Sequence, residues 1–156
     1  NMVFKRFDDN ERDASVLLDF RDDWAEKILT IDESISNIDT ATLWVYGKAR
    51  DDIERTGDSH YLLVNHVRHI YFNPNVEFSD PVENENWWVW ISFDIPTSWL
   101  NQGSNIFKIC DGFSQWTERN LYIGIDTDNN YEASNILQNK VQLDGELMIY
   151  LKLTFV

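Results

Sequence analysis

Cysteine, proline, glycine and positive charge are all scarce in this sequence of 156 residues, and each scarcity excludes a class of structure or partner. The single cysteine, Cys110, can form no intrachain disulfide and no cysteine-based metal site. With 3 prolines and 6 glycines, the chain has no linker-like or low-complexity stretch. Lys and Arg number 13 against 27 Asp and Glu, and the resulting net charge of −14 argues against nucleic acid and anionic membranes as partners. No apolar run reaches the roughly 18 residues that a membrane-spanning helix requires.

Large apolar side chains, in contrast, are plentiful. The chain contains 7 Trp, 6 Tyr and 9 Phe, and apolar residues make up 43 % of it. This is enough to fill the core of one domain of ordinary size. We therefore expect a single domain spanning residues 1–156 that folds without disulfides or metal, with Cys110 as a buried structural thiol.

The dominant pattern is alternation of apolar and polar residues in short runs rich in β-branched and aromatic side chains, which is typical of β-strands. Only Asp22–Glu26 and Pro96–Leu100 resemble short helical turns. About nine short strands without a long helix predict a β-sandwich or barrel. The predicted strands are Val16–Phe20, Lys27–Ile31, Thr40–Lys48, Tyr61–Val67, His69–Phe72, Trp87–Ile95, Asn105–Cys110, Leu121–Asp126 and Glu146–Phe155.

Several of these segments carry motifs in a recognisable order. They are Asp39–Tyr46, Tyr61–Asn65, Ile91–Pro96 followed by Leu100–Phe107, and Met148–Leu153. Together they resemble the core strands and the "FDI…LxxGxN" signature of galactose-binding-like jelly-roll domains, over roughly Ile38 to Phe155. The resemblance implies an all-β jelly-roll sandwich of two antiparallel sheets.

Domains of that family are commonly attached to glycoside hydrolases and polysaccharide lyases as non-catalytic carbohydrate-binding modules. The resemblance therefore implies a secreted or cell-surface, lectin-like module within a larger polypeptide that carries a catalytic domain. Two departures stand out. His66 follows Asn65 where relatives often have glycine, and Ile149 and Tyr150 replace an aspartate that helps many relatives to bind calcium.

The strand period also sorts side chains between the two faces of each strand. Because the apolar set must face the core, the alternate residues of three strands point outward, Met148 and Lys152 among them. In a jelly roll these strands share one sheet, with the last strand between the other two. Five aromatic residues then share its outer face, namely Trp44, Tyr46, Trp88, Trp90 and Tyr150.

Aromatic rings match the apolar faces of pyranose rings, and Lys48, Arg50 and Lys152 can bond hydroxyl groups nearby. This predicts a carbohydrate-binding platform on the sheet. The alternative is that Asn1–Asp19 or Asn73–Asn86 covers the face and turns it into a second core.

Loops at the rim of the sandwich form a second candidate site, because many relatives bind sugars there. Trp116, Glu118 and Arg119 lie in one such loop, and Tyr131 and Asn135 lie in another. Trp99 is expected to plug one end of the sandwich. Loop geometry cannot be derived from sequence, so the face and the rim stay open as alternatives.

A calcium site is a further hypothesis. Asp126, Asp128 and Asn130 have the oxygen-rich spacing that Ca²⁺ favours, although an ordinary polar turn has the same composition. The histidines at 60, 66 and 69 are close in sequence, but alternation would place the last two on opposite faces. No GxSxG, HExxH or phosphate-loop motif occurs, so we expect no enzymatic activity.

The sequence thus predicts non-catalytic binding of a polysaccharide or oligosaccharide, which would target an attached or partner enzyme. A structural or protein-interaction domain, such as a spacer or adhesion module, is the alternative from another class. A small hydrolase or lyase is the second alternative.

Overall fold

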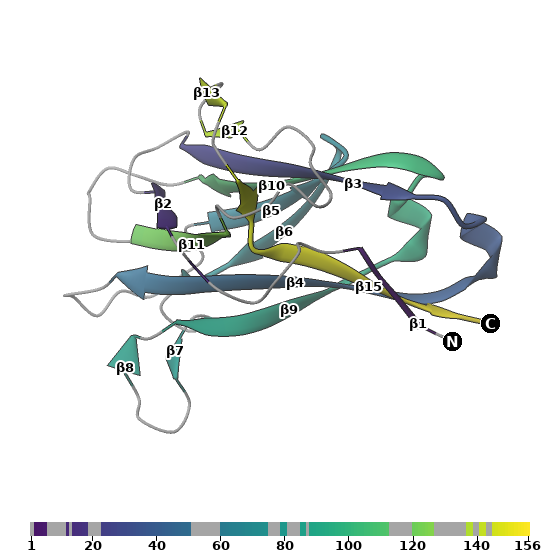
Figure 1. Cartoon of the computed structure of the whole chain (residues 1–156), viewed down its shortest axis with the longest axis horizontal. Coiled ribbons are helices and arrows are strands. Elements are labelled where there is room, and N and C mark those ends of the chain that lie inside the picture. Colours follow the sequence, from purple (N-terminus) through teal and green to yellow (C-terminus); the bar gives the residue numbers. More distant parts are fainter. Residues whose placement is uncertain are drawn as a thin grey trace.

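The computed structural model describes residues 2–5, 12, 14–18, 23–50, 60–74, 79–80, 85–86, 88–112, 120–126, 137–138, 141–142 and 145–156. These residues form two antiparallel β-sheets that pack face to face (Figure 1). The predicted all-β sandwich is therefore confirmed. No helix among the described residues is long and apolar enough to cross a membrane.

The first sheet has seven strands and is organised around the long strand β4 (Ile38–Arg50). One edge of β4 pairs with β15 (Ile149–Phe155), and the other pairs with β9 (Val89–Ile95). The prediction that the last strand lies between the other two is wrong, because β4 occupies that position. The remaining strands are β1 (Met2–Lys5), β2 (Ala14–Leu18), β11 (Asn120–Asp126) and β14 (Glu146–Leu147).

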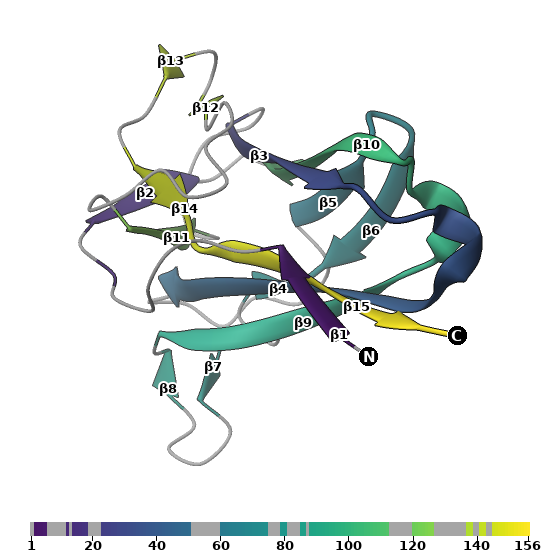
Figure 2. The same cartoon turned by 45° about the vertical axis from the view of Figure 1, so that its right-hand side comes forward.

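The second sheet has six strands, and it forms the upper layer in Figures 1 and 2. Its order is β13 (Val141–Gln142), β12 (Leu137–Gln138), β3 (Trp24–Ile31), β10 (Gly103–Asp111), β5 (His60–Val64) and β6 (Arg68–Phe72). A short hairpin of β7 (Ser79–Asp80) and β8 (Glu85–Asn86) projects beyond β9, away from this sheet.

Every predicted strand corresponds to an observed one, with shifted ends. The expected helical turn at Asp22–Glu26 is wrong, since β3 begins at Trp24 and its pairing with β10 overrides the local preference. The turn expected at Pro96–Leu100 is present as the 3-10 helix η2 (Thr97–Trp99), and another 3-10 helix, η1 (Ile35–Asn37), precedes β4. The strands missed by the sequence have two to four residues, too few to show a period.

Alternate residues of the long strands fill the space between the sheets, as the strand period predicts. Leu43 and Val45 of β4 are fully buried, as are Leu29 of β3 and Phe107 of β10. Lys27 is also fully buried on the same side of β3, and its Nζ donates to the carbonyl oxygens of Leu147 and Ile149, each at 3.1 Å. A lysine therefore bridges the two sheets through the interior.

The lysine bridge lies where the last strand changes partner. Met148 separates β14 from β15; its N–H donates to the carbonyl oxygen of Gly124 at 2.8 Å, and its own carbonyl accepts from Tyr46 at 3.0 Å. The chain thus passes from β11 to β4 at Met148. Lys27 supplies donors to the carbonyl groups on either side of this irregularity, where the regular ladder is interrupted.

The turn between β5 and β6 holds two residues with positive φ, Asn65 at 51° and His66 at 63°. The N–H of Val67 donates to the carbonyl oxygen of Val64 at 3.1 Å and closes the turn. Positive φ at both central positions is characteristic of a type I′ turn, in which glycine is favoured at the second position. His66 therefore occupies a backbone conformation in which its Cβ is strained.

Substitution of His66 by glycine should raise the free energy of unfolding by about 0.5–1 kcal/mol, because glycine has no Cβ to strain at this φ. Urea unfolding of the two proteins measures the difference. Val67→Gly is the matched control: Val67 is 67 % exposed and lacks a positive φ, so glycine there should only lower stability. A His66→Gly variant less stable than the wild type would contradict the strain.

Candidate functional site

Six aromatic residues lie along the outer face of the first sheet, and we call them the aromatic row. Strand register creates the centre of the row, because Trp44 lies directly opposite Tyr150, and Tyr46 lies directly opposite Trp90. Trp88 just precedes β9, and Tyr122 of β11 is a sixth member that the sequence analysis did not single out. The outward direction predicted for the five aromatic residues is thus consistent with the register.

The rings of the aromatic row are in contact from one end to the other. Their centroids are 6.1 Å apart for Trp44–Tyr150, 5.2 Å for Tyr150–Trp90, 5.0 Å for Trp90–Tyr46, 5.4 Å for Tyr46–Trp88 and 6.4 Å for Trp88–Tyr122. All of these lie within the range in which aromatic pairs attract each other. The row is therefore one continuous aromatic surface built from four strands and the residue before β9.

The rings support one another rather than lying open, since every member of the row is half-buried. Met148 lies on this face beside Tyr46, as its predicted outward direction implies, but it is fully buried there. Gly124 explains the burial: a Cβ there would lie 2.9 Å from Met148 Sδ and 3.0 Å from a ring carbon of Tyr46. The missing side chain leaves room in which Met148 and Tyr46 pack against the sheet.

The described parts of the N-terminal segment extend the first sheet rather than cover its face. β1 pairs with the edge of β15, and β2 pairs with β11. Arg12 is the exception, because its guanidinium carbon lies 4.2 Å from the centroid of the Trp88 ring. Among the described residues of this N-terminal segment, Arg12 is thus the one whose side chain covers part of the aromatic row, and it does so at one end.

A pocket of about 270 Å³ lies at the Tyr122 end of the row, and we call it the row-end pocket. It is lined by Ser15 of β2, Lys48 of β4, Trp88 and Tyr122. Pairing of β11 with both neighbours creates it, since Tyr122 lies directly opposite Lys48 while Ser15 lies opposite Gly124. The pocket combines two aromatic rings with an ammonium and a hydroxyl group, which can bond hydroxyl groups of a ligand.

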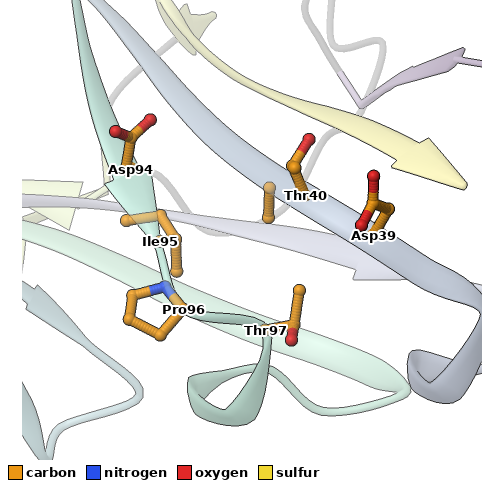
Figure 3. A pocket seen from close by; sticks show the side chains of 7 residues that line it. Asp39, Thr40, Asp94, Ile95, Pro96 and Thr97 are labelled. Atoms are coloured by element: carbon orange, nitrogen blue, oxygen red, sulfur yellow. The ribbon is translucent and has the colours of Figure 1, made fainter.

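Two further hollows lie along β9. The larger, of about 390 Å³, is lined by Asp39, Thr40, Ala41 and residues 94–97, and Figure 3 shows its carboxylates on β4 and β9. The other, of about 240 Å³, lies between β6 and β9. Neither contains a member of the aromatic row among its described residues. We therefore place the candidate site at the row-end pocket, although it is not the largest hollow.

Several predicted site residues lie outside the described part of the chain. They are the rim residues Trp116, Glu118, Arg119, Tyr131 and Asn135 and the loop residues Asp128 and Asn130. The backbone of Arg50 lies opposite Asn120 at the end of β4, but its side chain is likewise outside the description. Trp99, predicted to plug the sandwich, is half-buried and packs against the hydrophobic core.

Asp126 is the described member of the predicted calcium site. It is fully buried, and it lies opposite Glu146, which is 1 % exposed. No three His, Cys, Asp or Glu side chains gather as metal ligands among the described residues. Carboxylate oxygens from Asp126 and Glu146 suit a hard cation, so the calcium site stays a prediction.

The three histidines do not converge. His60 is fully buried, with Nε2 3.4 Å from the carbonyl oxygen of Leu18 and 3.9 Å from a carboxylate oxygen of Asp111. His66 lies in the exposed turn, and His69 contacts Tyr61 and Tyr71 on the second sheet.

That contact belongs to a smaller aromatic cluster that the sequence analysis missed. The rings of Tyr61, His69 and Tyr71 lie 5.2–5.8 Å apart on the outer face of the second sheet, and Tyr71 is 61 % exposed. The signal was present in the strand period of the β5–β6 hairpin, which places all three on one face.

Cys110 is buried, as expected. Burial raises the pKa of its thiol to about 11, and a hydrogen bond from Tyr61 offsets part of this effect. Because the thiolate is the reactive form, this cysteine is a structural thiol and a poor nucleophile at neutral pH.

No protein-family model matches this chain, and no curated protein sequence matches it significantly. The resemblance to galactose-binding-like domains therefore rests on the sequence motifs alone. The function must be argued from the site itself.

Proposed function

We propose that this domain binds carbohydrate without catalysis, and that the ligand occupies the row-end pocket and the adjoining aromatic row. The observation that carries the proposal is the unbroken contact of six aromatic rings that ends in a pocket with polar groups. Such a row is unusual on a sheet face that faces solvent, where polar residues are the norm.

The chemistry of the pocket suits a sugar. A pyranose ring has apolar C–H faces and polar edges, so it is best bound by aromatic rings together with a few hydrogen-bonding groups. Tyr122 and Trp88 supply the rings, while Lys48 and Ser15 supply the polar groups. The other four rings hold Trp88 in place through its stacking on Tyr46.

The proposed role is binding alone. The described lining of the row-end pocket holds no pair of carboxylates, which glycoside hydrolysis commonly uses. We propose that the domain acts as a targeting module that keeps an attached or partner enzyme near a polysaccharide.

Substitution of Tyr122 or Trp88 by alanine should weaken binding by about 1–3 kcal/mol, because each removes an aromatic surface in contact with the ligand. A glycan array identifies the ligand, and titration calorimetry measures the loss. Tyr71→Ala is the matched control, since it removes an exposed aromatic ring from the opposite sheet and should leave affinity unchanged.

The rim alternative predicts the reverse pattern. Trp116→Ala and Tyr131→Ala would then abolish binding, and Tyr122→Ala and Trp88→Ala would bind normally. That pattern, or a glycan array without any ligand for the folded domain, would contradict the proposal.

A further inference from the structure

Two cationic side chains lie at the row-end pocket. The whole chain has 13 Lys and Arg against 27 Asp and Glu, yet Lys48 lines this pocket and Arg12 lies over Trp88, one of its walls. Among the residues that the structure describes, no carboxylate lines the pocket. The described groups at this pocket therefore include two cationic side chains, in a chain whose net charge is −14.

The side chain of Arg12 is positioned by packing against its neighbours. Its Cδ would lie 3.5 Å from a Cβ at Gly124, so the aliphatic part of the side chain lies over the glycine beside Met148 and Tyr46. Its guanidinium carbon is then 4.2 Å from the centre of the Trp88 ring, within the range of a cation–π interaction. The packing thus holds the guanidinium group at the pocket.

A guanidinium held in this way keeps its hydrogen-bonding capacity. Its donors lie in the plane of the group, so contact between its flat face and an aromatic ring does not use them. Arg12 is an exposed residue, and its N–H groups can therefore reach a ligand from solvent. The planar fork of donors matches the two oxygens of a carboxylate.

From this arrangement we infer that the row-end pocket selects an acidic sugar, one whose carboxylate is bound by Arg12 and Lys48 while its ring contacts Tyr122 and Trp88. The inference rests on the proposed function and adds the charge of the ligand to it. The chemistry required is a sugar with an anionic group. A uronic acid supplies it as a planar carboxylate, which we favour, and a sulfated sugar supplies it as a tetrahedral ester.

Titration calorimetry with matched oligosaccharides tests the inference. The probes are oligomers of glucuronate, galacturonate, mannuronate and guluronate, their methyl esters, and sulfated and neutral galactans. At least one uronate should bind on the order of tenfold more tightly than its own ester, and its affinity should fall as salt rises.

Each other outcome has a separate meaning. If neutral or esterified sugars bind as tightly as the acids and lose affinity in Tyr122→Ala, the proposed function stands and the acidic ligand is overturned. A sulfated galactan that binds more tightly than every uronate overturns the carboxylate. Binding of no probe at all overturns both proposals.

Substitutions of Arg12 and Lys48 test whether these residues bind the anionic group of the sugar. Arg12→Gln and Lys48→Gln should each weaken uronate binding about tenfold and reduce its salt dependence, and each should weaken binding of the ester much less. Lys108→Gln is the matched control, because Lys108 Nζ also lies 4.2 Å over a tryptophan ring, that of Trp24 on the second sheet. Equal losses for acid and ester in the Arg12 and Lys48 variants, or a similar loss in the Lys108 variant, would overturn the inference.

Discussion

Replacement of Lys27 by alanine should lower the free energy of unfolding by about 3–5 kcal/mol, because it leaves a void in the core and removes the donor of two buried hydrogen bonds. Lys27 is fully buried on β3, and its Nζ donates to the carbonyl oxygens of Leu147 and Ile149 on the opposite sheet, both at 3.1 Å. These carbonyl groups flank the point where the last strand passes from β11 to β4. The substitution therefore weakens the contact between the sheets where the ladder is interrupted.

Urea unfolding of Lys27→Ala and Lys27→Met separates the two contributions. Methionine fills most of the volume but donates no hydrogen bond, so its cost should be about 1–3 kcal/mol. A methionine variant as stable as the wild type would assign the whole loss to packing. If Lys27→Ala loses less than about 1 kcal/mol, as surface substitutions do, the buried bridge is wrong.

Replacement of Asn105 by alanine should lower stability by about 2–4 kcal/mol, because several partly buried polar groups lose their hydrogen bonds to this fully buried amide together. The Oδ1 of Asn105 accepts from the N–H of Asn101 at 2.8 Å and from Nδ2 of Asn65 at 3.0 Å. Its Nδ2 donates to the carbonyl oxygens of Asn101 at 2.7 Å and Gly103 at 3.1 Å. The fully buried amide thus joins the start of β10 to the β5–β6 turn.

Gln102→Ala is the control for this network. Gln102 belongs to the same loop and donates to the carbonyl oxygen of Asp32 at 3.1 Å, but it is exposed, so its loss should cost less than about 0.5 kcal/mol. Thermal or urea unfolding gives both values. Equal stability of the two variants would show that the buried amide contributes no more than a surface side chain.

Much of the fold was predictable from residues alone. The period of two placed Trp44 and Trp90 on the outer side of their strands, since Leu43, Val45 and Phe93 had to be buried. The turn chemistry around Gly103 was also predictable, because Gly103 has a φ of 98° and Asn105 Nδ2 donates to the carbonyl oxygen of Gly103, two residues earlier. These features depend on the local chain, and local sequence specifies them.

The candidate site was only half predictable. Trp88 and Lys48 were both predicted beside the aromatic platform, but the pocket also needs Tyr122 and Ser15 from two further strands and Arg12 from a segment between strands. Burial of Met148 likewise depends on Gly124, which lies 24 positions away in the chain and beside it in the sheet.

The sequence by itself thus determined the longer strands, the core face of each and the tight turns, because these follow from side-chain period and backbone sterics within a few residues. Tertiary structure decided the central position of β4, the contact of all six rings and the placement of Arg12 and Lys48 at the row-end pocket. The physical reason is that a strand shows the same alternation whichever neighbour it pairs with, so the alternation does not predict the order of strands in a sheet. Only the pairing of distant strands brings those side chains together.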